Sequence, residues 1–352
     1  MIPLISYLKE KGIAALCSEF HIKADYSLIY PELVCLCYHH TKSPKNEITN
    51  DCRGIIINKD TFEIVCYPFR RFFDYNENVK TNFDFSSFYF AEKVDGSLCN
   101  VWFYDGTWNV STKSSADASG MIKYIGMSYA DYFWQVWGNK KYEYDLDRDF
   151  THMFEFKFPS DTQFITQAKT ESITLIGRRN NETLQEFGVM TENICNDFET
   201  LKQIVNSMNP VTCEGYVLVD ENFNRLKLKS PAYDLLALLK KGDENYAHNK
   251  EILIKVSKYF DRFHIDFNKF LQDRYDLKET FVVIIRAKRY LLNNLKDALE
   301  DVGDLEGKEL GLYAKDSYLK KVLFTLKKLG DEFKLLEQIS MNIYIELIKA
   351  NL

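Results

Sequence analysis

The spacing of apolar residues changes once along this chain, near residue 232, and this change constrains the fold more than any other feature. Before it, short β-branched and aromatic runs alternate with turn residues, a pattern typical of strands. After it, apolar residues recur three and four positions apart with charges between them, which indicates amphipathic helices. The sequence therefore predicts an α+β body over residues 1–240 and an all-α domain over residues 241–352.

Individual elements follow from the same patterns. Residues 3–17 are predicted to form a helix with Pro3 in its first turn. Asp105 and Gly106 are predicted to close a two-residue hairpin. Strands are expected at 53–58, 62–67, 97–104, 107–112, 152–157, 172–179, 215–220 and 225–229. Helices are expected near 117–137 and at 196–208, 233–241, 249–261, 277–299, 316–329 and 331–349, with a charged connector at 301–311.

Composition narrows the class of protein. With 46% apolar and 27% charged residues among 352, the chain is neither disordered nor a small disulfide scaffold. Its eight cysteines follow no Cys-x-x-Cys spacing, which favours reduced, buried thiols. No membrane span or signal peptide is expected, so we predict a cytoplasmic protein, in the host cytoplasm if the chain is viral. A net charge of −6 excludes a uniformly basic nucleic-acid binder and leaves local basic patches.

A short motif, Lys93-x-Asp95-Gly96, stands before a predicted strand. A chain of this length contains such a motif by chance roughly one time in ten or twenty, and a surface turn with a solvated lysine would explain it. Its neighbours along the chain make it more specific. They are, in order, DCRGIIIN (51–58), YPFRRFFDYNEN (67–78), KVDGSL (93–98), VSTKSS (110–115), FEF (154–156), EGYVLV (214–219) and LKLKS (226–230).

The chemistry of a nucleophilic lysine sets requirements on its surroundings. The amine must be neutral to attack, whereas its ordinary pKa is about 10.4. Positive charge nearby or desolvation lowers that pKa. Arg53, Lys227, Lys229 or a bound metal are the candidates for supplying this charge. We therefore expect the amine of Lys93 to lie uncharged in a pocket lined by these cations.

Lys227 and Lys229 stand two positions apart in a predicted strand, so both side chains emerge on one face. Two ammonium groups on one face repel each other unless an anion lies between them, and a triphosphate is such an anion. The alternative is an edge strand that displays lysines to water, a common device against aggregation.

Two glutamates accompany the lysines. Strand alternation places Glu155 on one face and Phe154 and Phe156 on the other. Glu214 opens a strand at which Gly215 allows close approach of the backbone. Such carboxylates suit magnesium, a hard cation that binds alongside substrate phosphates.

The ordered set of motifs resembles the covalent nucleotidyltransferases, the superfamily of polynucleotide ligases and mRNA capping enzymes. Within it, the chain is most similar to the bacteriophage RNA ligase 1 family of ATP-dependent tRNA-repair ligases. The shared elements span residues 52–230. The resemblance implies a nucleotidyltransferase domain with ATP-grasp-like antiparallel sheets, followed by a helical domain that recognises RNA.

The resemblance also implies roles for individual residues. Lys93 becomes the nucleophile, and Lys227 and Lys229 complete the catalytic set. The expected cofactors are ATP, with AMP carried covalently on Lys93, and Mg²⁺ or Mn²⁺ near Glu155 and Glu214. Nucleotide contacts are expected from Arg53, Arg71, Asp95, Gly96, Lys113, Glu155, Ile176, Glu214, Lys227 and Lys229.

One position departs from the related ligases. The strand after FEF often offers an aromatic platform for adenine there, but here it reads SITLIGRR. Ile176 or a neighbour is therefore expected to cover the base as an aliphatic wall.

The implied reaction joins RNA ends that carry a 5′-phosphate and a 3′-hydroxyl, through lysyl-AMP and RNA-adenylate intermediates, in RNA repair. A cleaved tRNA is one candidate substrate. A capping guanylyltransferase or a DNA ligase is the nearest alternative, but both usually continue into a small β-barrel where this chain becomes helical. A non-catalytic RNA-binding protein of the same fold is a further alternative, against which the intact lysines and glutamates argue.

Two other clusters, one of cysteines and histidines and one of basic residues, have simpler structural interpretations. Cys35, Cys37 and the histidines that follow match no usual zinc spacing and indicate a buried strand. Arg286, Arg289 and Lys296 lie close to one face of a predicted helix. They would contact RNA phosphates or simply form a solvated face.

Overall fold

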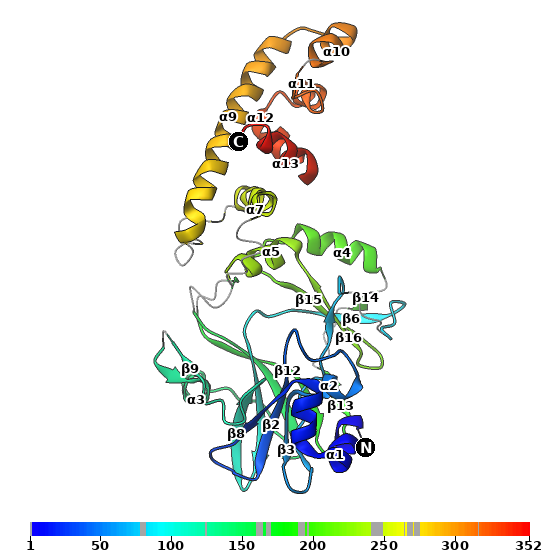
Figure 1. Cartoon of the computed structure of the whole chain (residues 1–352), viewed down its shortest axis with the longest axis vertical. Helices are drawn as coiled ribbons and strands as arrows, with labels where there is room; N and C mark the ends of the chain where they lie inside the picture. Colours follow the sequence, from blue (N-terminus) through cyan, green and yellow to red (C-terminus); the bar gives the residue numbers. More distant parts are fainter. Residues whose placement is uncertain are drawn as a thin grey trace. The chain divides into compact units, whose positions relative to one another are not determined.

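The computed structural model describes residues 2–77, 82–123, 125–159, 165–166, 170–188, 194–195, 197–240, 249–263, 265, 270, 275–315 and 317–352. The chain divides into two compact units, Met1–Met208 with Thr212–Ser230, and Asn209–Val211 with Pro231–Leu352. Helix α5 (Pro231–Lys240), which the sequence analysis assigned to the first domain, groups with the second unit. Figure 1 shows the sheets of the first unit and the helices of the second.

Among the described residues, the first unit contains three larger sheets and a separate two-stranded sheet. The first sheet has the order β1 (Ile22–Tyr26), β2 (Leu33–Tyr38), β3 (Arg53–Asn58) and β4 (Ile64–Cys66). The second has the order β13 (Glu186–Gly188), β12 (Ser172–Asn180), β11 (Phe150–Lys157), β7 (Ser97–Tyr104) and β8 (Thr107–Thr112). The third has the order β14 (Ile194–Cys195), β6 (Phe88–Glu92), β15 (Gly215–Asp220), β16 (Arg225–Lys229) and β5 (Phe73–Asp74).

Turn chemistry sets the hairpin between β7 and β8. Asp105 and Gly106 both have positive φ, 45° and 76°, as a two-residue turn between twisted strands requires. Tyr104 pairs with Thr107 directly across this turn, so the predicted hairpin is confirmed. Five predicted strands, β3, β7, β8, β15 and β16, have the predicted bounds, and three others are present with shifted ends.

Each of the three larger sheets of the first unit packs against a helix. Helix α1 (Pro3–Phe20) packs its apolar side chains against the first sheet, with Leu4, Leu8 and Leu16 fully buried. Helix α3 (Tyr129–Lys140) covers the phenylalanine face of β11 on the second sheet. Helix α4 (Phe198–Ser207) lies along the third sheet (Figure 1). The opposite face of the second sheet is partly apolar, with Trp102 packed beside Leu33, Cys35 and Ile56 of the first sheet and with Leu98 and Met153 packed beside Phe69.

The third sheet corrects one interpretation of the lysine strand. β16 lies between β15 and β5, paired antiparallel to the first and parallel to the second. It is not an edge strand, so its lysines are not a device that protects an open edge.

The second unit is helical, as predicted. It contains α5, α7 (Lys250–Arg262), α9 (Tyr275–Val302), α10 (Gly307–Lys315), α11 (Leu323–Leu329), α12 (Glu332–Gln338) and α13 (Met341–Lys349). The long helix α9 buries Phe281, Ile284, Leu291 and Leu295 and contacts α7, α11, α12 and α13. Its outer positions Arg286, Arg289 and Lys296 are exposed. Within the part of the chain that the structure describes, every helix is too short or too polar to cross a bilayer.

Three helix predictions and the prediction of a connector were wrong in part. The segment 117–137 contains the hairpin β9 (Met121–Ile122) and β10 (Met127–Ser128), and α3 begins only after Ser128, which caps it. The connector 301–311 includes the start of α10, and residues 317–322 precede α11 as turns. The segment 331–349 forms two helices because Ile339 is extended and Ser340 caps α13. At α3 and α13 the differences reflect capping serines that apolar spacing alone does not reveal.

Candidate active site

Lys93 directly follows β6 and lies beside the start of β15. Its main-chain N–H donates to the carbonyl oxygen of Gly215 across 2.8 Å, and its Nζ donates to Oε2 of Glu214 across 2.9 Å. Glu214 is buried, and its carbonyl oxygen accepts a hydrogen bond from the N–H of Ser230 at the end of β16. Three strands of the third sheet therefore fix this amine and its carboxylate partner.

Gly215 makes this arrangement possible. Its φ of 141° disfavours other residues, and a Cβ there would lie 2.2 Å from the carbonyl oxygen of Leu228. The close backbone approach predicted at this glycine is therefore confirmed, and it brings Glu214 next to the end of β16.

The charge state of Lys93 differs from the prediction. Burial by itself lowers the pKa of Lys93, but the carboxylates of Glu214 and Glu155 outweigh it, and the net pKa lies above the ordinary value. The expectation of an uncharged amine among cations is therefore wrong, because its dominant neighbours are acids. The side chain is 21% exposed, so the amine is held within the site and does not extend into bulk water.

Lys227 and Lys229 do emerge on one face of β16, as predicted, and a carboxylate lies between them. Asp74 of β5 places Oδ2 3.2 Å from Nζ of Lys229 and Oδ1 3.9 Å from Nζ of Lys227. Nζ of Lys229 is also 3.8 Å from Oε1 of Glu214. The chain Lys93, Glu214, Lys229, Asp74 and Lys227 thus alternates in charge from one end to the other.

Lys227 has the lowered pKa that was expected for the nucleophile. Burial lowers the pKa of Lys227 to about 8, and the positive charges of Arg53 and Lys229 add to this effect, whereas Asp74 opposes it. Near neutral pH the group therefore changes charge more readily than an ordinary lysine.

An aromatic ring joins Arg53 to this chain. The guanidinium of Arg53 lies 5.2 Å, and Nζ of Lys227 4.9 Å, from the centre of the Phe72 ring. Both distances allow cation–π attraction, which holds two like charges close together. Arg53, predicted to lie near the nucleotide, is therefore part of the same cluster.

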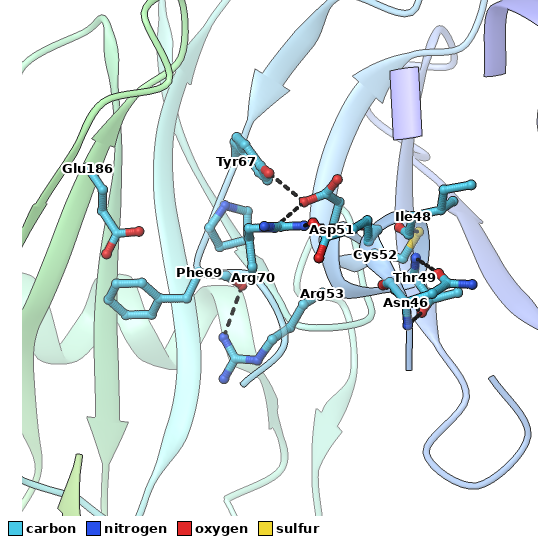
Figure 2. A network of polar contacts seen from close by, with 12 residues as sticks. Asn46, Ile48, Thr49, Asp51, Cys52, Arg53, Tyr67, Phe69, Arg70 and Glu186 are labelled. Atoms are coloured by element: carbon cyan, nitrogen blue, oxygen red, sulfur yellow. Dashed lines mark hydrogen bonds and ion pairs between the residues drawn. The ribbon is translucent and has the colours of Figure 1, made fainter. Parts of the chain in front are cut away.

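A buried polar network positions Arg53 (Figure 2). Helix α2 (Glu47–Asp51) ends at Asp51, whose Oδ1 accepts hydrogen bonds from the hydroxyl of Tyr67 and from Nε of Arg70, each 2.6 Å long. Nη1 of Arg53 donates to the carbonyl oxygen of Phe69 across 3.5 Å. Segment 67–70 is thereby tied to α2, and Arg53 at the start of β3 is directed toward Phe72.

Two further predicted cations share a second ring. The guanidinium of Arg71 and Nζ of Lys113 each lie 4.1 Å from the centre of the Tyr38 ring. Arg71 is buried and donates Nη2 to the carbonyl oxygen of His40 across 3.3 Å, whereas its buried Nη1 has no hydrogen-bond partner among the described atoms. A positively charged group with an unsatisfied donor is suited to an anion.

Glu155 and Glu214 fit a cation that is held mainly through its bound waters. Burial raises the pKa of Glu155 to about 7. The neighbouring carboxylates of Glu214 and Asp95 raise this pKa further, whereas the charge of Lys93 lowers it. A cation would relieve this crowding of negative charge. No group of three His, Cys, Asp or Glu side chains is arranged to enclose a metal within the described ranges. The fit is to a cation that keeps most of its waters, as Mg²⁺ does.

Asp95 and Gly96 contribute through packing. Oδ2 of Asp95 accepts hydrogen bonds from the N–H groups of Ile165 and Thr166, both 3.0 Å, and from the Thr166 hydroxyl. A Cβ on Gly96 would lie 2.8 Å from the carbonyl oxygen of Phe156. Asp95 therefore anchors residues 165–166, and Gly96 lets the motif pass close to β11.

Ile176 is aimed by a β-bulge. Met153 pairs with Gly177 and Phe154 pairs with Leu175, so Ile176 is the extra residue of β12. Its side chain packs with Phe72 against the apolar cluster of Phe69, Leu98 and Met153. The sequence pattern contains no signal for this bulge.

Three residues of the cluster were missed by the sequence analysis. Asp74, Phe72 and Tyr38 place or neutralise the predicted cations. Phe72 and Asp74 lie inside the quoted segment 67–78, and the aromatic-next-to-basic pattern there was the available signal. Asn78, at the end of that segment, lies outside the described residues.

Comparisons with known proteins place RNA ligases among the relatives of this chain. A family model described as RNA ligase matches residues 51–233. A putative bifunctional polynucleotide kinase/RNA ligase of Autographa californica nuclear polyhedrosis virus is 27% identical over 263 residues, 66% of this chain and 37% of that protein. An RNA ligase of Rhodothermus phage RM378 is 30% identical over 163 residues, 36% of each chain. The chain thus spans little more than a third of the curated relatives it matches.

Solved structures with partial likeness include ligases. An archaeal ATP-dependent RNA ligase has a TM-score of 0.45 at 12% identity, covering 81% of this chain and 83% of that chain. A putative ATP-dependent DNA ligase from Aquifex aeolicus has a TM-score of 0.44 at 14% identity, covering 89% and 88%.

The matched segment 51–233 holds more than half of the 352 residues, together with Lys93, Glu155, Glu214 and both lysines of β16. The resemblance seen in the motifs is confirmed: the chain belongs to the RNA ligase family.

Proposed function

We propose that this protein is an ATP-dependent RNA ligase that joins a 5′-phosphate to a 3′-hydroxyl through an adenylate on Lys93. The observation that carries the proposal is the charge-alternating chain in which Lys93, Lys229 and Lys227 meet around Glu214 and Asp74. Several lysines gathered around one site are what capture of a polyphosphate requires. Membership of the RNA ligase family supports the same conclusion.

In the first step, Nζ of Lys93 attacks the α-phosphorus of ATP. A nitrogen–phosphorus bond forms, the bond to the β-phosphate oxygen breaks, and pyrophosphate leaves. The amine has to lose a proton first, and the hydrogen-bonded carboxylate of Glu214 is the nearest acceptor, at 2.9 Å. Lys227, Lys229 and Arg53 would hold the phosphates and offset their developing charge.

The later steps transfer the nucleotide and seal the strand. An oxygen of the RNA 5′-phosphate attacks the adenylate, the nitrogen–phosphorus bond breaks, and RNA-adenylate forms. The 3′-hydroxyl then attacks the 5′-phosphorus and AMP leaves. Lys93 regains its proton earlier, when the nitrogen–phosphorus bond breaks and AMP passes to the RNA, which matches the raised pKa of this amine.

Other groups have supporting roles in this proposal. Arg71 and Lys113 would receive the outer phosphates at Tyr38, since Arg71 retains an unsatisfied donor. Ile176 beside Phe72 would cover the base. Magnesium, held through water by Glu155 and Glu214, would supply charge neutralisation on the phosphates. Asp95 and Gly96 would shape the site without contacting the nucleotide through their side chains.

We further propose that the substrate is a broken RNA, such as a cleaved tRNA, and that the helical unit contributes to its recognition. The viral relative is named as both a kinase and a ligase, and a kinase acting on RNA ends would supply the 5′-phosphate that a ligase consumes. Arg286, Arg289 and Lys296 are exposed on α9 and are available for phosphate contacts.

A sealing assay tests the function. A 5′-phosphorylated RNA should be circularised or joined with ATP and Mg²⁺, whereas the same RNA with a 5′-hydroxyl should be left unjoined. Preference for GTP without sealing would indicate a capping enzyme, and sealing of nicked DNA instead of RNA would indicate a DNA ligase. Binding of RNA without any nucleotide transfer would indicate a binding protein and contradict the proposal.

A further inference from the structure

The carboxylate between the two lysines of β16 belongs to the protein itself. Asp74 approaches Lys229 to 3.2 Å with one oxygen and Lys227 to 3.9 Å with the other. Two ammonium groups on one strand face require an anion between them, and the chain supplies its own. Any polyphosphate that uses these lysines therefore meets a negative charge already present.

The backbone holds this carboxylate in place. Asp74 is the register partner of Lys227 in the parallel pair β5 and β16. The N–H of Tyr75 donates to the carbonyl oxygen of Lys227 across 2.8 Å, and the N–H of Asp74 donates to Oε1 of Glu77 across 3.1 Å. The position of Asp74 is thus fixed on both sides, and only its short side chain can turn away.

Asp74 faces a lysine with each of its carboxylate oxygens. Its Oδ2 accepts a hydrogen bond from Nζ of Lys229 across 3.2 Å, whereas its Oδ1 is buried and has no hydrogen-bond partner among the described atoms. Asp51 is likewise paired through one oxygen only: its Oδ1 accepts hydrogen bonds of 2.6 Å from Tyr67 and Arg70, and its Oδ2 has no partner among the described atoms. The two acids differ in the groups they meet, because Asp74 faces the cations on which nucleotide binding is proposed to depend.

We propose that Asp74 is an internal counter-ion that occupies Lys227 and Lys229 until phosphates arrive and, by competing for them, sets the affinity for ATP and pyrophosphate. This inference rests on the proposed function, because it takes these lysines as the phosphate-binding groups. Asp74 is a positioning residue, since it acts through the lysines. Its competition would weaken the hold on pyrophosphate and so favour its release after adenylation, which limits the reverse reaction.

The direct test is calorimetric binding of inorganic pyrophosphate, without added metal and at fixed ionic strength. Asp74→Asn keeps the shape of the side chain and removes the charge, and it should tighten pyrophosphate binding about tenfold, within the usual range of coupling between two sites. Asp74→Glu keeps the charge and should stay near the wild-type value. Asp74→Ser is prepared as a second neutral variant in case Asp74→Asn does not fold.

Glu77→Gln is the matched control. It removes one negative charge three positions from Asp74 and keeps the oxygen that accepts a hydrogen bond from the Asp74 N–H. The ion pair that it breaks is with Lys45, not with a lysine of β16. It should change pyrophosphate affinity by less than about twofold, because its ion pair is to Lys45, and Lys227 contributes least among the groups that lower the pKa of Glu77. If Asp74→Asn and Glu77→Gln tightened pyrophosphate binding equally, the effect would come from net charge alone and the inference would be overturned.

Kinetics separates this role from a structural one. Neutral variants at Asp74 should lower the KM for ATP in protein labelling, and the maximal rate should change less than the KM. Labelling of the wild type together with unchanged pyrophosphate affinity in the neutral variants would overturn the counter-ion role and leave the ligase function standing. Tighter pyrophosphate binding in the neutral variants, without any labelling of the wild type, would support the counter-ion role and contradict the ligase function.

Discussion

Nζ of Lys93 donates a 2.9 Å hydrogen bond to Oε2 of Glu214, a residue 121 positions further along the chain. This bond and the nearby charge of Glu155 keep the pKa of the amine above its ordinary value in spite of burial. In the proposed mechanism, the nucleophile is therefore stored as an ammonium ion, and its activation requires the balance of charge around it to change. Incoming phosphates cannot by themselves lower this pKa, so we propose that proton transfer to Glu214 is part of the mechanism.

Glu214→Gln should lower the pKa of Lys93 and raise its reactivity toward a small amine-selective reagent at pH 8 severalfold, because a charged acceptor is replaced by a neutral one. Competitive labelling followed by peptide mass spectrometry measures this reactivity for Lys93 against the surface lysines. Glu155→Gln, which removes a charge without removing the hydrogen bond, should act in the same direction and less strongly. Unchanged reactivity in Glu214→Gln would show that this carboxylate does not control the amine.

The pH dependence of ATP capture should follow the ionisation of Lys227. Burial lowers the pKa of Lys227 to about 8, so its charge is present below that pH and is lost as the pH rises through it. We expect kcat/KM for ATP in protein labelling to fall above pH about 8, because this ratio reports groups of the free enzyme. Lys227→Arg keeps its charge throughout, and it should abolish the alkaline fall even if the overall rate is lower. The same fall in both proteins would assign it to another group.

Gly215→Ala should destabilise the first unit by more than about 2 kcal/mol, since a side chain would clash with backbone and no flexible neighbour can yield. The added Cβ would lie 2.2 Å from the carbonyl oxygen of Leu228 and 2.8 Å from Cα of Lys229. Urea denaturation measures the change in the free energy of unfolding. Gly106→Ala is the control, because Gly106 also has positive φ but no atom within 4 Å of the new Cβ. Gly106→Ala should lower the free energy of unfolding by about 1 kcal/mol. Equal losses in the two variants would mean that backbone strain, and not the clash at residue 215, accounts for both.

A buried ion network links the second and third sheets. Glu186 of β13 pairs with Arg179 at 2.5 Å and with Arg225 of β16, and all three side chains are less than one-tenth exposed. Glu186→Gln would leave two guanidinium groups without their countercharge, and should cost about 3–5 kcal/mol in the free energy of unfolding. Glu182→Gln, in an exposed turn of the same segment, should change it by less than about 0.5 kcal/mol. Comparable stability of the two variants would show that the network does not hold the sheets together.

Local patterns predicted much of this molecule. The strands β3, β7, β8, β15 and β16 were found with their bounds because alternation and turn residues are properties of short segments. The same logic placed Lys227 and Lys229 on one face, and it separated Glu155 from the phenylalanines that pack under α3. Motif order then identified the family.

Relationships between distant segments could not be predicted in this way. Asp74 meets β16 through a two-residue parallel strand, which has too few residues to leave a pattern. Ile176 is directed by a bulge that depends on the pairing of β11 with β12. The charge of Lys93 depends on which side chains surround it in space, and the sequence favoured cations where the structure has Glu214 and Glu155. Tertiary contacts decide these features, whereas sequence patterns decide the elements that carry them.

The most direct measurement is the location of a covalent nucleotide. The protein is incubated with α-labelled ATP and Mg²⁺, digested, and the modified peptide is identified by mass spectrometry, with acid lability as the mark of a nitrogen–phosphorus bond. We predict AMP on Nζ of Lys93, and no label in Lys93→Ala or in Lys93→Arg, whose guanidinium keeps the charge but cannot act as the nucleophile. Label on another residue, or full labelling of Lys93→Ala, would contradict this prediction.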